Sequence, residues 1–172
     1  EFTAIEALSG SYIKQLKSDK KGNIWMATAG SGIIRVQPTE NNYLVEKWGY
    51  SDGLLSSRIT TLHFDKKGRL WYGSEGNGVG CFDPKIEKNI LKFTAEDNGI
   101  LASNLIRTIA EDNFGRLWVG TADAGLSVLR MYEAQRAPWN LGQNEGLRSE
   151  NIYLLIQDQD GNIISGTEKG ID

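Results

Sequence analysis

A short segment that begins with aspartate occurs four times in this chain, and this repetition is the strongest constraint on its fold. Three copies read Asp19-Lys-Lys-Gly22-Asn-Ile-Trp25, Asp65-Lys-Lys-Gly68-Arg-Leu-Trp71 and Asp112-Asn-Phe-Gly115-Arg-Leu-Trp118, and the fourth reads Asp158-Gln-Asp-Gly161-Asn-Ile-Ile164. The aspartates lie 46, 47 and 46 residues apart. Such a period is typical of a unit that cannot bury its own apolar surface and stacks on copies of itself, as in propellers and solenoids.

The residues before each aspartate predict a first strand. Each copy has isoleucine six residues before the aspartate and leucine or isoleucine three residues before it: Ile13 and Leu16, Ile59 and Leu62, Ile106 and Ile109, Ile152 and Leu155. Residues an odd number apart on a regular strand point to opposite faces. We therefore expect this strand to be covered on both faces.

The Asp-x-x-Gly segment predicts a hairpin, because aspartate bonds nearby backbone amides and glycine accepts a positive φ. A second strand follows, rich in Trp, Ile, Leu and Val. It contains a small residue in every copy, and we expect a large ring from the next unit to occupy that space. These small residues are Ala27, Gly73, Gly120 and Gly166.

Two more apolar segments complete each period, and the last one contains an aromatic residue that we place at its end: Trp48, Phe93 or Trp139. No segment has helical periodicity. The predicted fold is all-β, a β-propeller of four-stranded antiparallel blades. The approximate repeats are 7–52, 53–98, 99–145 and 146–172; the last is incomplete, and residues 1–6 could complete it.

About four blades are present, which leaves three ways to protect their edges. The chain could be part of a larger propeller, half of a ring made by a homodimer, or a closed four-bladed ring. An open piece would expose apolar blade faces and unpaired strand edges, which invites association.

Composition excludes several functions. A net charge of -3 without a basic stripe argues against a nucleic-acid partner. No apolar run approaches the roughly 18 residues of a membrane span, so we expect no direct membrane insertion. The chain has one histidine, His63, and one cysteine, Cys81. We expect Cys81 to be buried as a small hydrophobic residue. We predict no metal site, cofactor or catalytic triad.

Function is expected in the loops that differ between copies. In propellers of this strand order, the loop after the fourth strand and the loop between the second and third strands lie on the same face. Their side chains would suit a polyhydroxylated ligand, although each could also be an ordinary solvated residue. The candidate ligand-binding residues are Tyr12, Arg58, Glu75, Asn104, Asp123, Arg148 and Asn151.

The residues that recur in every copy are interpreted as structural, because a fixed place in the repeat is explained by turns and packing between blades. Asp158-Gln-Asp160 lacks the further ligands of a calcium loop and is assigned to a turn. This structural set comprises Asp19, Gly22, Trp25, Asp65, Gly68, Trp71, Asp112, Gly115, Trp118, Asp158 and Gly161.

The segment Asn104-Leu-Ile-Arg-Thr-Ile-Ala-Glu-Asp-Asn-Phe-Gly-Arg-Leu-Trp-Val-Gly-Thr121, with Gly125-Leu126, resembles the two-component regulator propeller repeat. The resemblance covers the whole chain in four copies, and the last departs from it at Ile164. Sensors of this family usually contain far more than four repeats, so the resemblance implies that the chain is part of a larger propeller. It implies a periplasmic or extracytoplasmic sensor region of a hybrid histidine kinase or related membrane signalling protein. Many members of this family are implicated in sensing glycans or other nutrients.

Three functions remain open. The first is a non-catalytic sensor segment that binds an extracellular, glycan-derived ligand and acts on the remainder of its own signalling protein. The second is a propeller enzyme, a lyase or glycosidase, with Glu75, Asp123, Glu150 and Glu168 as candidate acids. The third is a protein-interaction scaffold.

Overall fold

The computed structural model describes residues 5–97, 99–130 and 138–172, which form an all-β propeller arrangement. These residues contain three four-stranded antiparallel sheets and one three-stranded sheet. The blades are β1 Ile13–Ser18, β2 Ile24–Thr28, β3 Ile33–Pro38 and β4 Tyr43–Trp48; β5 Ile59–Phe64, β6 Leu70–Ser74, β7 Val79–Asp83 and β8 Lys88–Phe93; β9 Ile106–Glu111, β10 Arg116–Thr121, β11 Leu126–Arg130 and β12 Trp139–Leu141; and β13 Ile152–Gln157, β14 Ile163–Thr167 and β15 Gly170–Ile171.

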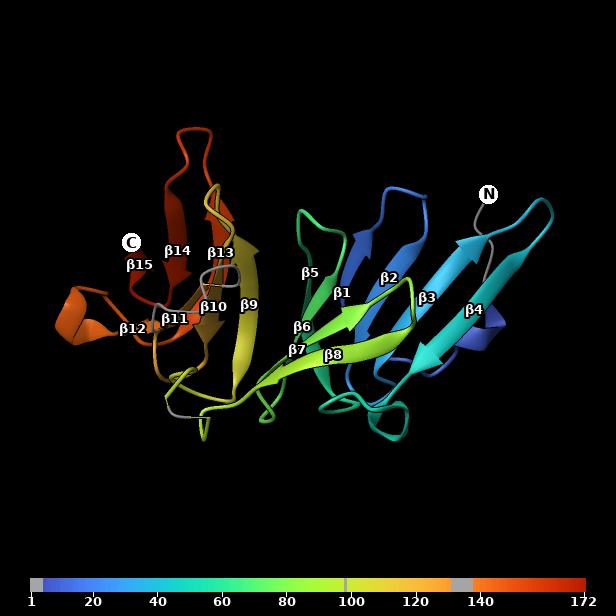
Figure 1. The fold of residues 1–172 in the computed structure, drawn as a ribbon, viewed down its shortest axis with the longest axis horizontal. Coiled ribbons are helices and arrows are strands. Elements are labelled where there is room, and N and C mark those ends of the chain that lie inside the picture. Colours follow the sequence, from blue (N-terminus) through green and yellow to red (C-terminus); the bar gives the residue numbers. More distant parts are fainter. Residues whose placement is uncertain (1–4, 98, 131–137) are drawn as a thin grey trace.

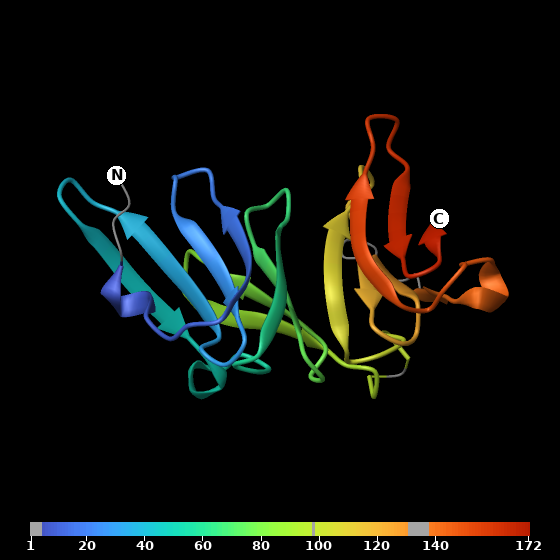
Figure 2. The same cartoon turned by 180° about the vertical axis from the view of Figure 1, so that it is seen from behind.

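The blades follow one another in chain order along an open arc, with the two ends of the chain at opposite ends (Figures 1 and 2). The first strands are neighbours, since β1 contacts β5, β5 contacts β9 and β9 contacts β13. These four strands form the inner wall of the arc. The Asp-x-x-Gly hairpins lie along the upper edge in Figure 1, and the connections between blades lie along the lower edge.

The described residues contain no α-helix, and three one-turn 3-10 helices occur in the connections: η1 Glu6–Leu8, η2 Tyr50–Asp52 and η3 Gln143–Glu145. The backbone N–H of Gly49 donates to Asp52, and that of Gly142 donates to Glu145. The same turn follows Trp48 in the first blade and Leu141 in the third, so Leu141 holds the place in its repeat that Trp48 holds in the first. Placing Trp139 at the end of its strand was therefore wrong: it begins β12 and lies opposite Val128, as the hydrogen-bonded register requires.

Each first strand contains a β-bulge, which overturns the expectation that its two apolar residues cover opposite faces. In β5 the pairing passes from Ile59 opposite Ser74 to Thr61 opposite Gly73, and Thr60 is left unpaired. Because the bulge adds one residue between them, Ile59 and Leu62 point to the same face, where both are fully buried. The same bulge falls at Lys14 in β1, Arg107 in β9 and Tyr153 in β13.

The small residue of the second strand does admit a close neighbour, but the neighbour is not a ring. A Cβ placed on Gly73 would lie 2.4 Å from Ile106 Cγ2, and one on Gly120 would lie 2.7 Å from Ile152 Cγ2. The isoleucine of the next first strand occupies the space, because the bulge turns that side chain toward the preceding blade. The expectation of a large ring was wrong.

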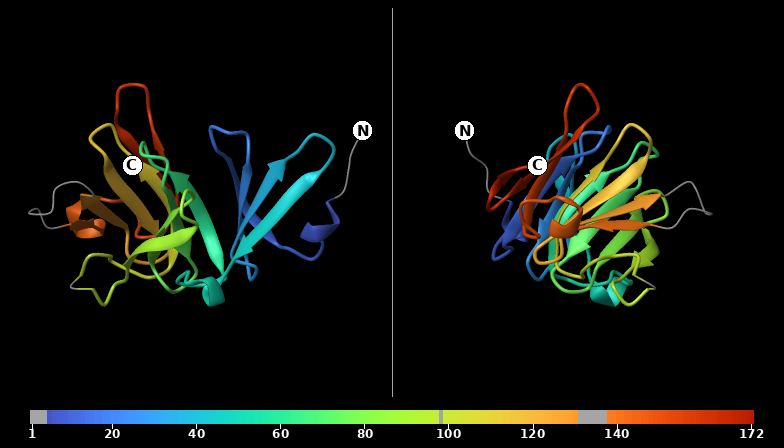
Figure 3. Two further views of the ribbon diagram at one scale, coloured as in Figure 1. Left: turned by 45° about the vertical axis from the view of Figure 1, so that its right-hand side comes forward. Right: turned by 90° about the vertical axis from the view of Figure 1, so that its left-hand side faces the viewer.

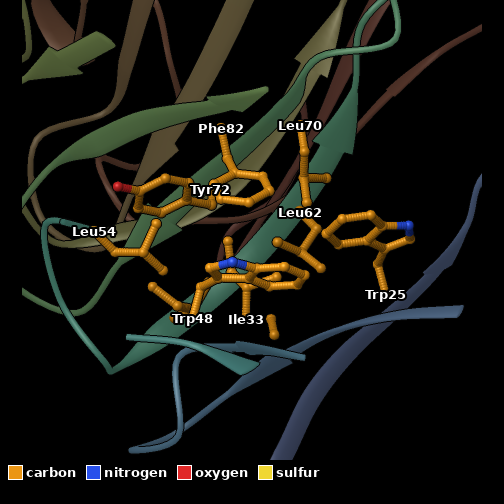
Figure 4. Packing of buried hydrophobic residues seen from close by; sticks show 10 residues of the cluster. Trp25, Ile33, Trp48, Leu54, Leu62, Leu70, Tyr72 and Phe82 are labelled. Atoms are coloured by element: carbon orange, nitrogen blue, oxygen red, sulfur yellow. The ribbon is translucent and has the colours of Figure 1, made fainter. Parts of the chain in front are cut away.

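The rings pack instead within and between blades (Figure 4). Trp25 stacks on Trp48 with ring centroids 5.7 Å apart, and Phe82 of the second blade closes the cluster at 5.1 Å from Trp48. Trp71 stacks on Phe93 in the second blade in the same way. The recurring tryptophans are thus placed between blades, and Trp25 and Trp71 are fully buried.

The turn aspartate ties the hairpin to the tryptophan. Trp118 Nε1 donates to Asp112 Oδ2 over 2.9 Å, the Arg116 guanidinium pairs with the same oxygen, and Oδ1 accepts the amides of Phe114 and Arg116. Burial alone would raise the pKa of Asp112, but the hydrogen bonds from Trp118 and Arg116 outweigh it and lower the pKa. The same bond from the indole joins Trp25 to Asp19 and Trp71 to Asp65.

The two ends of the arc expose apolar side chains. In the first blade Ile13 is 37% and Leu16 is 57% exposed, although Ile59 and Leu62 at the same places are buried. In the last blade Leu154, Ile156 and Ile171 are exposed. Ile5 and Leu8 pack on the first blade. Residues 1–4, the rest of the segment that could complete the last blade, lie outside the described residues.

We expect Asp112→Ala to lower the free energy of unfolding by about 2 kcal/mol or more, because it leaves the partly buried indole N–H and two turn amides without their acceptor. Asp158→Ala is the matched control, since the fourth copy has Ile164 in place of tryptophan and Asp158 bonds only Asn162 and its turn. Urea unfolding of both variants checks this. Equal losses would contradict a role for the indole bond.

Candidate functional site

The loops that join neighbouring blades meet along one edge, as expected from the strand order (Figure 3). The amides of Gly76 and Gly78, between β6 and β7, both donate to the carbonyl of Asn104, which leads into β9. Gly30 and Gly32 donate to Ser57 in the same way. Each blade therefore holds the chain that enters the next one, which gives this edge a rigid frame.

A hollow of about 440 Å³ opens on the inner wall beside this edge. All four bulged residues line it, because a bulge re-aims the side chain of its extra residue out of the regular strand. The hollow therefore collects one side chain from each blade. Its lining is Lys14, Thr60, Glu75, Leu105, Ile106, Arg107, Ala122 and Tyr153.

The lining combines an aromatic ring with cationic groups. The Arg107 guanidinium lies over the ring of Tyr153, 4.8 Å from its centroid, and the Tyr153 hydroxyl is 3.4 Å from Asn151 Nδ2. Lys14 Nζ lies 4.9 Å from the ring centroid of Tyr12. Tyr153 remains 47% exposed, so the ring is held in place while still open to solvent.

Some of the residues predicted from the sequence come together here. Glu75 lines the hollow, and Arg58 pairs with it at 2.8 Å. Asn151 contacts Tyr153 and Glu168, and Tyr12 contacts Lys14. Both Arg58 and Glu75 are largely exposed, so their pair adds little to stability.

The other predicted residues lie elsewhere. The side chain of Asn104 is used within its own loop, where Oδ1 accepts the amide of Ala95 and Nδ2 donates to Glu96. Arg148 pairs with Asp172 at 3.3 Å. Asp123 is exposed and does not line the hollow.

Sequence reasoning missed the bulged residues themselves, although the sequence contains a signal for them. The residue after the recurring isoleucine differs in every copy, as Lys14, Thr60, Arg107 and Tyr153, while the isoleucine before it is the same in all four. On a regular strand this residue would face a neighbouring blade. Only the observed bulge places it toward the hollow.

A second hollow, of about 630 Å³, lies at the outer edge of the first blade between residues 5–7 and 38–45. Its lining comes from one hairpin and from η1 with the residue before it, so the blades do not converge on it. It also adjoins residues outside the described part of the chain.

Burial shifts the pKa values of the one cysteine and the one histidine away from neutral pH. Cys81 is buried, which raises the pKa of its thiol to about 12. Burial, aided by the charge of Lys17, lowers the pKa of His63 to about 4. No cluster of three or more His, Cys, Asp or Glu side chains suited to a metal ion occurs within the described ranges.

In the part of the chain that the structure describes, no helix has the length and apolar character needed to cross a membrane.

Comparison with known proteins identifies the repeat. Residues 53–76 and 100–123, each spanning the end of one connection, a first strand, its hairpin and a second strand, match the family model of the two component regulator propeller. These two segments match the two-component regulator propeller repeat. No curated protein matches it at a significant level.

Solved structures similar to this chain include two from B. thetaiotaomicron. One, described as the extracellular domain of the hybrid two component system BT3049, is 24% identical with a TM-score of 0.81, over 99% of this chain and 22% of its own. The extracellular domain of BT4673 is 25% identical with a TM-score of 0.77, over 95% and 24%. The chain thus spans about a quarter of the length of these solved extracellular domains.

The fold also occurs in an enzyme. A virginiamycin B lyase from Staphylococcus aureus is 13% identical with a TM-score of 0.66, over 94% of this chain and 55% of its own. At this identity the likeness concerns the fold alone.

We expect the chain to lose stability as the pH falls from about 6.5 toward 4. His63 is buried in a neutral form with a pKa of about 4, so the unfolded chain binds its proton first, and up to about 3 kcal/mol is lost. Glu111, 4.0 Å from His63 Nε2, has a pKa raised by burial and offsets part of the loss at the acidic end.

Urea unfolding between pH 7 and pH 5 measures this dependence, and His63→Gln is the control because the chain has no other histidine. An unchanged pH dependence in His63→Gln would show that His63 does not cause it.

Proposed function

We propose that this chain is a ligand-sensing segment of an extracytoplasmic two-component signalling protein, non-catalytic in itself. Its ligand would bind in the inner-wall hollow. The observation that carries the proposal is the bulge in each first strand. The four blades repeat their frame but present four different side chains, Lys14, Thr60, Arg107 and Tyr153, to one space.

The lining supports a saccharide or other polyhydroxylated extracellular ligand. Sugars have apolar ring faces, which pack on aromatic rings, and hydroxyl groups, which accept and donate hydrogen bonds. Tyr153 supplies the ring, and Lys14 and Arg107 supply donors. The proposed location outside the cytoplasm follows the solved B. thetaiotaomicron structures, which are described as extracellular domains.

The enzyme alternative has less support from the geometry. Of the four candidate acids only Glu75 lines the hollow, and Arg58 already holds it. Glu168 accepts from Ser149 Oγ and lies 3.4 Å from Asn151 Nδ2. General acid and base catalysis needs two such groups around one substrate bond.

We expect Tyr153→Ala to weaken binding of the oligosaccharide that binds the wild-type chain by roughly tenfold or more, because an exposed ring that packs on a sugar is lost. Tyr43→Ala is the control, since Tyr43 is similarly exposed at the outer edge of the first blade. A thermal-shift screen against a glycan panel followed by calorimetric titration measures this.

Two outcomes would contradict the sensor proposal. One is the absence of any stabilising glycan. The other is conversion of the bound glycan to products, detected by chromatography, with loss of turnover in Glu75→Gln or Glu168→Gln.

The apolar side chains exposed at the two ends of the arc are candidate contact surfaces for a partner. Ile13 and Leu16, at one end, occupy positions that are buried in the other blades, and Leu154 and Ile156 are exposed at the other end. We propose that further blades of the same signalling protein cover them. A single-chain mass in solution agrees with this, whereas a stable two-chain species, disrupted by Leu16→Glu but not by Tyr43→Glu, would favour a second copy instead.

A further inference from the structure

The two cations that line the hollow have no anionic partner in the described residues. Lys14 and Arg107 are both exposed. The ion pairs described along this edge join Arg58 to Glu75 and Arg148 to Asp172, and neither includes them. Their charges are therefore available to a ligand.

Two acidic groups at this edge, Glu75 and Glu168, already accept hydrogen bonds from other side chains. Glu75 Oε2 accepts from Nε and Nη2 of Arg58, at 3.1 and 2.8 Å. Glu168 accepts from Ser149 over 2.9 Å. Because Arg58 offsets the single carboxylate of the lining, the hollow as a whole carries an excess of positive charge.

Stacking on Tyr153 gives Arg107 a defined direction. A guanidinium over an aromatic face keeps its N–H groups in its own plane, where they can meet two oxygens of a carboxylate or sulfate together. The Tyr153 hydroxyl lies beside Asn151 at the same site and can hydrogen-bond a sugar hydroxyl. An anionic group and a sugar ring would thus be recognised side by side.

We propose that the hollow takes a saccharide that carries an anionic substituent, a carboxylate or a sulfate, bound by Arg107 and Lys14 with its ring beside Tyr153. This inference rests on the proposed function and narrows its ligand class. A neutral saccharide would leave both cations without a partner and would gain only the ring contact and hydroxyl bonds.

Calorimetric titration of the chain with four probes tests the proposal: a short oligogalacturonide, its carboxyl-reduced form, a sulfated carrageenan oligosaccharide and its desulfated form. We expect at least one anionic probe to bind roughly tenfold or more tightly than its neutral counterpart, and its affinity to fall as salt is raised. The pair that differs identifies whether a carboxylate or a sulfate is recognised.

Variants of a residue that lines the hollow test whether the anionic probe binds there. We expect Arg107→Gln to lose roughly tenfold or more in affinity for the anionic probe, and Arg107→Lys to lose less because it keeps the charge but not the planar fork. Lys20→Gln is the control, since Lys20 is an exposed lysine in the β1–β2 hairpin at the opposite edge. Thermal unfolding shows that each variant is folded.

The outcomes separate this inference from the proposed function. Equal affinity for an anionic probe and its neutral counterpart, or unchanged affinity in Arg107→Gln, would overturn the anionic ligand and leave a sensor of neutral saccharides. Absence of binding by any of the four probes and by the wider glycan panel would overturn both.

Discussion

The β-bulge in each first strand is the constraint on which both the packing and the candidate site depend. It adds one residue between the recurring isoleucine and the rest of the strand, so Ile59 and Leu62 share a face and pack on the preceding blade. The same extra residue leaves the ladder and faces the hollow. The bulge thereby gives the strand two roles: its recurring apolar residues pack between blades, and its extra residue differs from blade to blade.

The frame around these bulges is held by hydrogen bonds of the turn aspartates and of the loop glycines. The turn aspartate accepts two or more amides and the indole N–H of the tryptophan six residues later, as Asp65 does with Trp71 at 3.0 Å. The glycine amides between the second and third strands bind the chain entering the next blade. A change at Lys14 or Arg107 therefore alters the hollow without disturbing the hydrogen bonds that hold the blades.

Much of the fold could be predicted from the sequence, because the same residue pattern occurs several times and each copy predicts the same turn and strands. The spacing of Asp112, Gly115 and Trp118 predicts a hairpin and a packed second strand, and the structure has both. The identity of the neighbour at Gly73 and the end of the strand at Trp139 were predicted wrongly, since both depend on register. Register is decided by hydrogen bonds to another strand, which a residue pattern does not specify.

The sequence by itself determined that this chain is a propeller of repeated four-stranded blades with tryptophans between them and variable groups at one edge. Only the tertiary structure decided which variable groups meet. The reason is physical: Lys14, Thr60, Arg107 and Tyr153 lie 46 or 47 residues apart, and they converge only because four bulges, each invisible to strand periodicity, face the same inner wall.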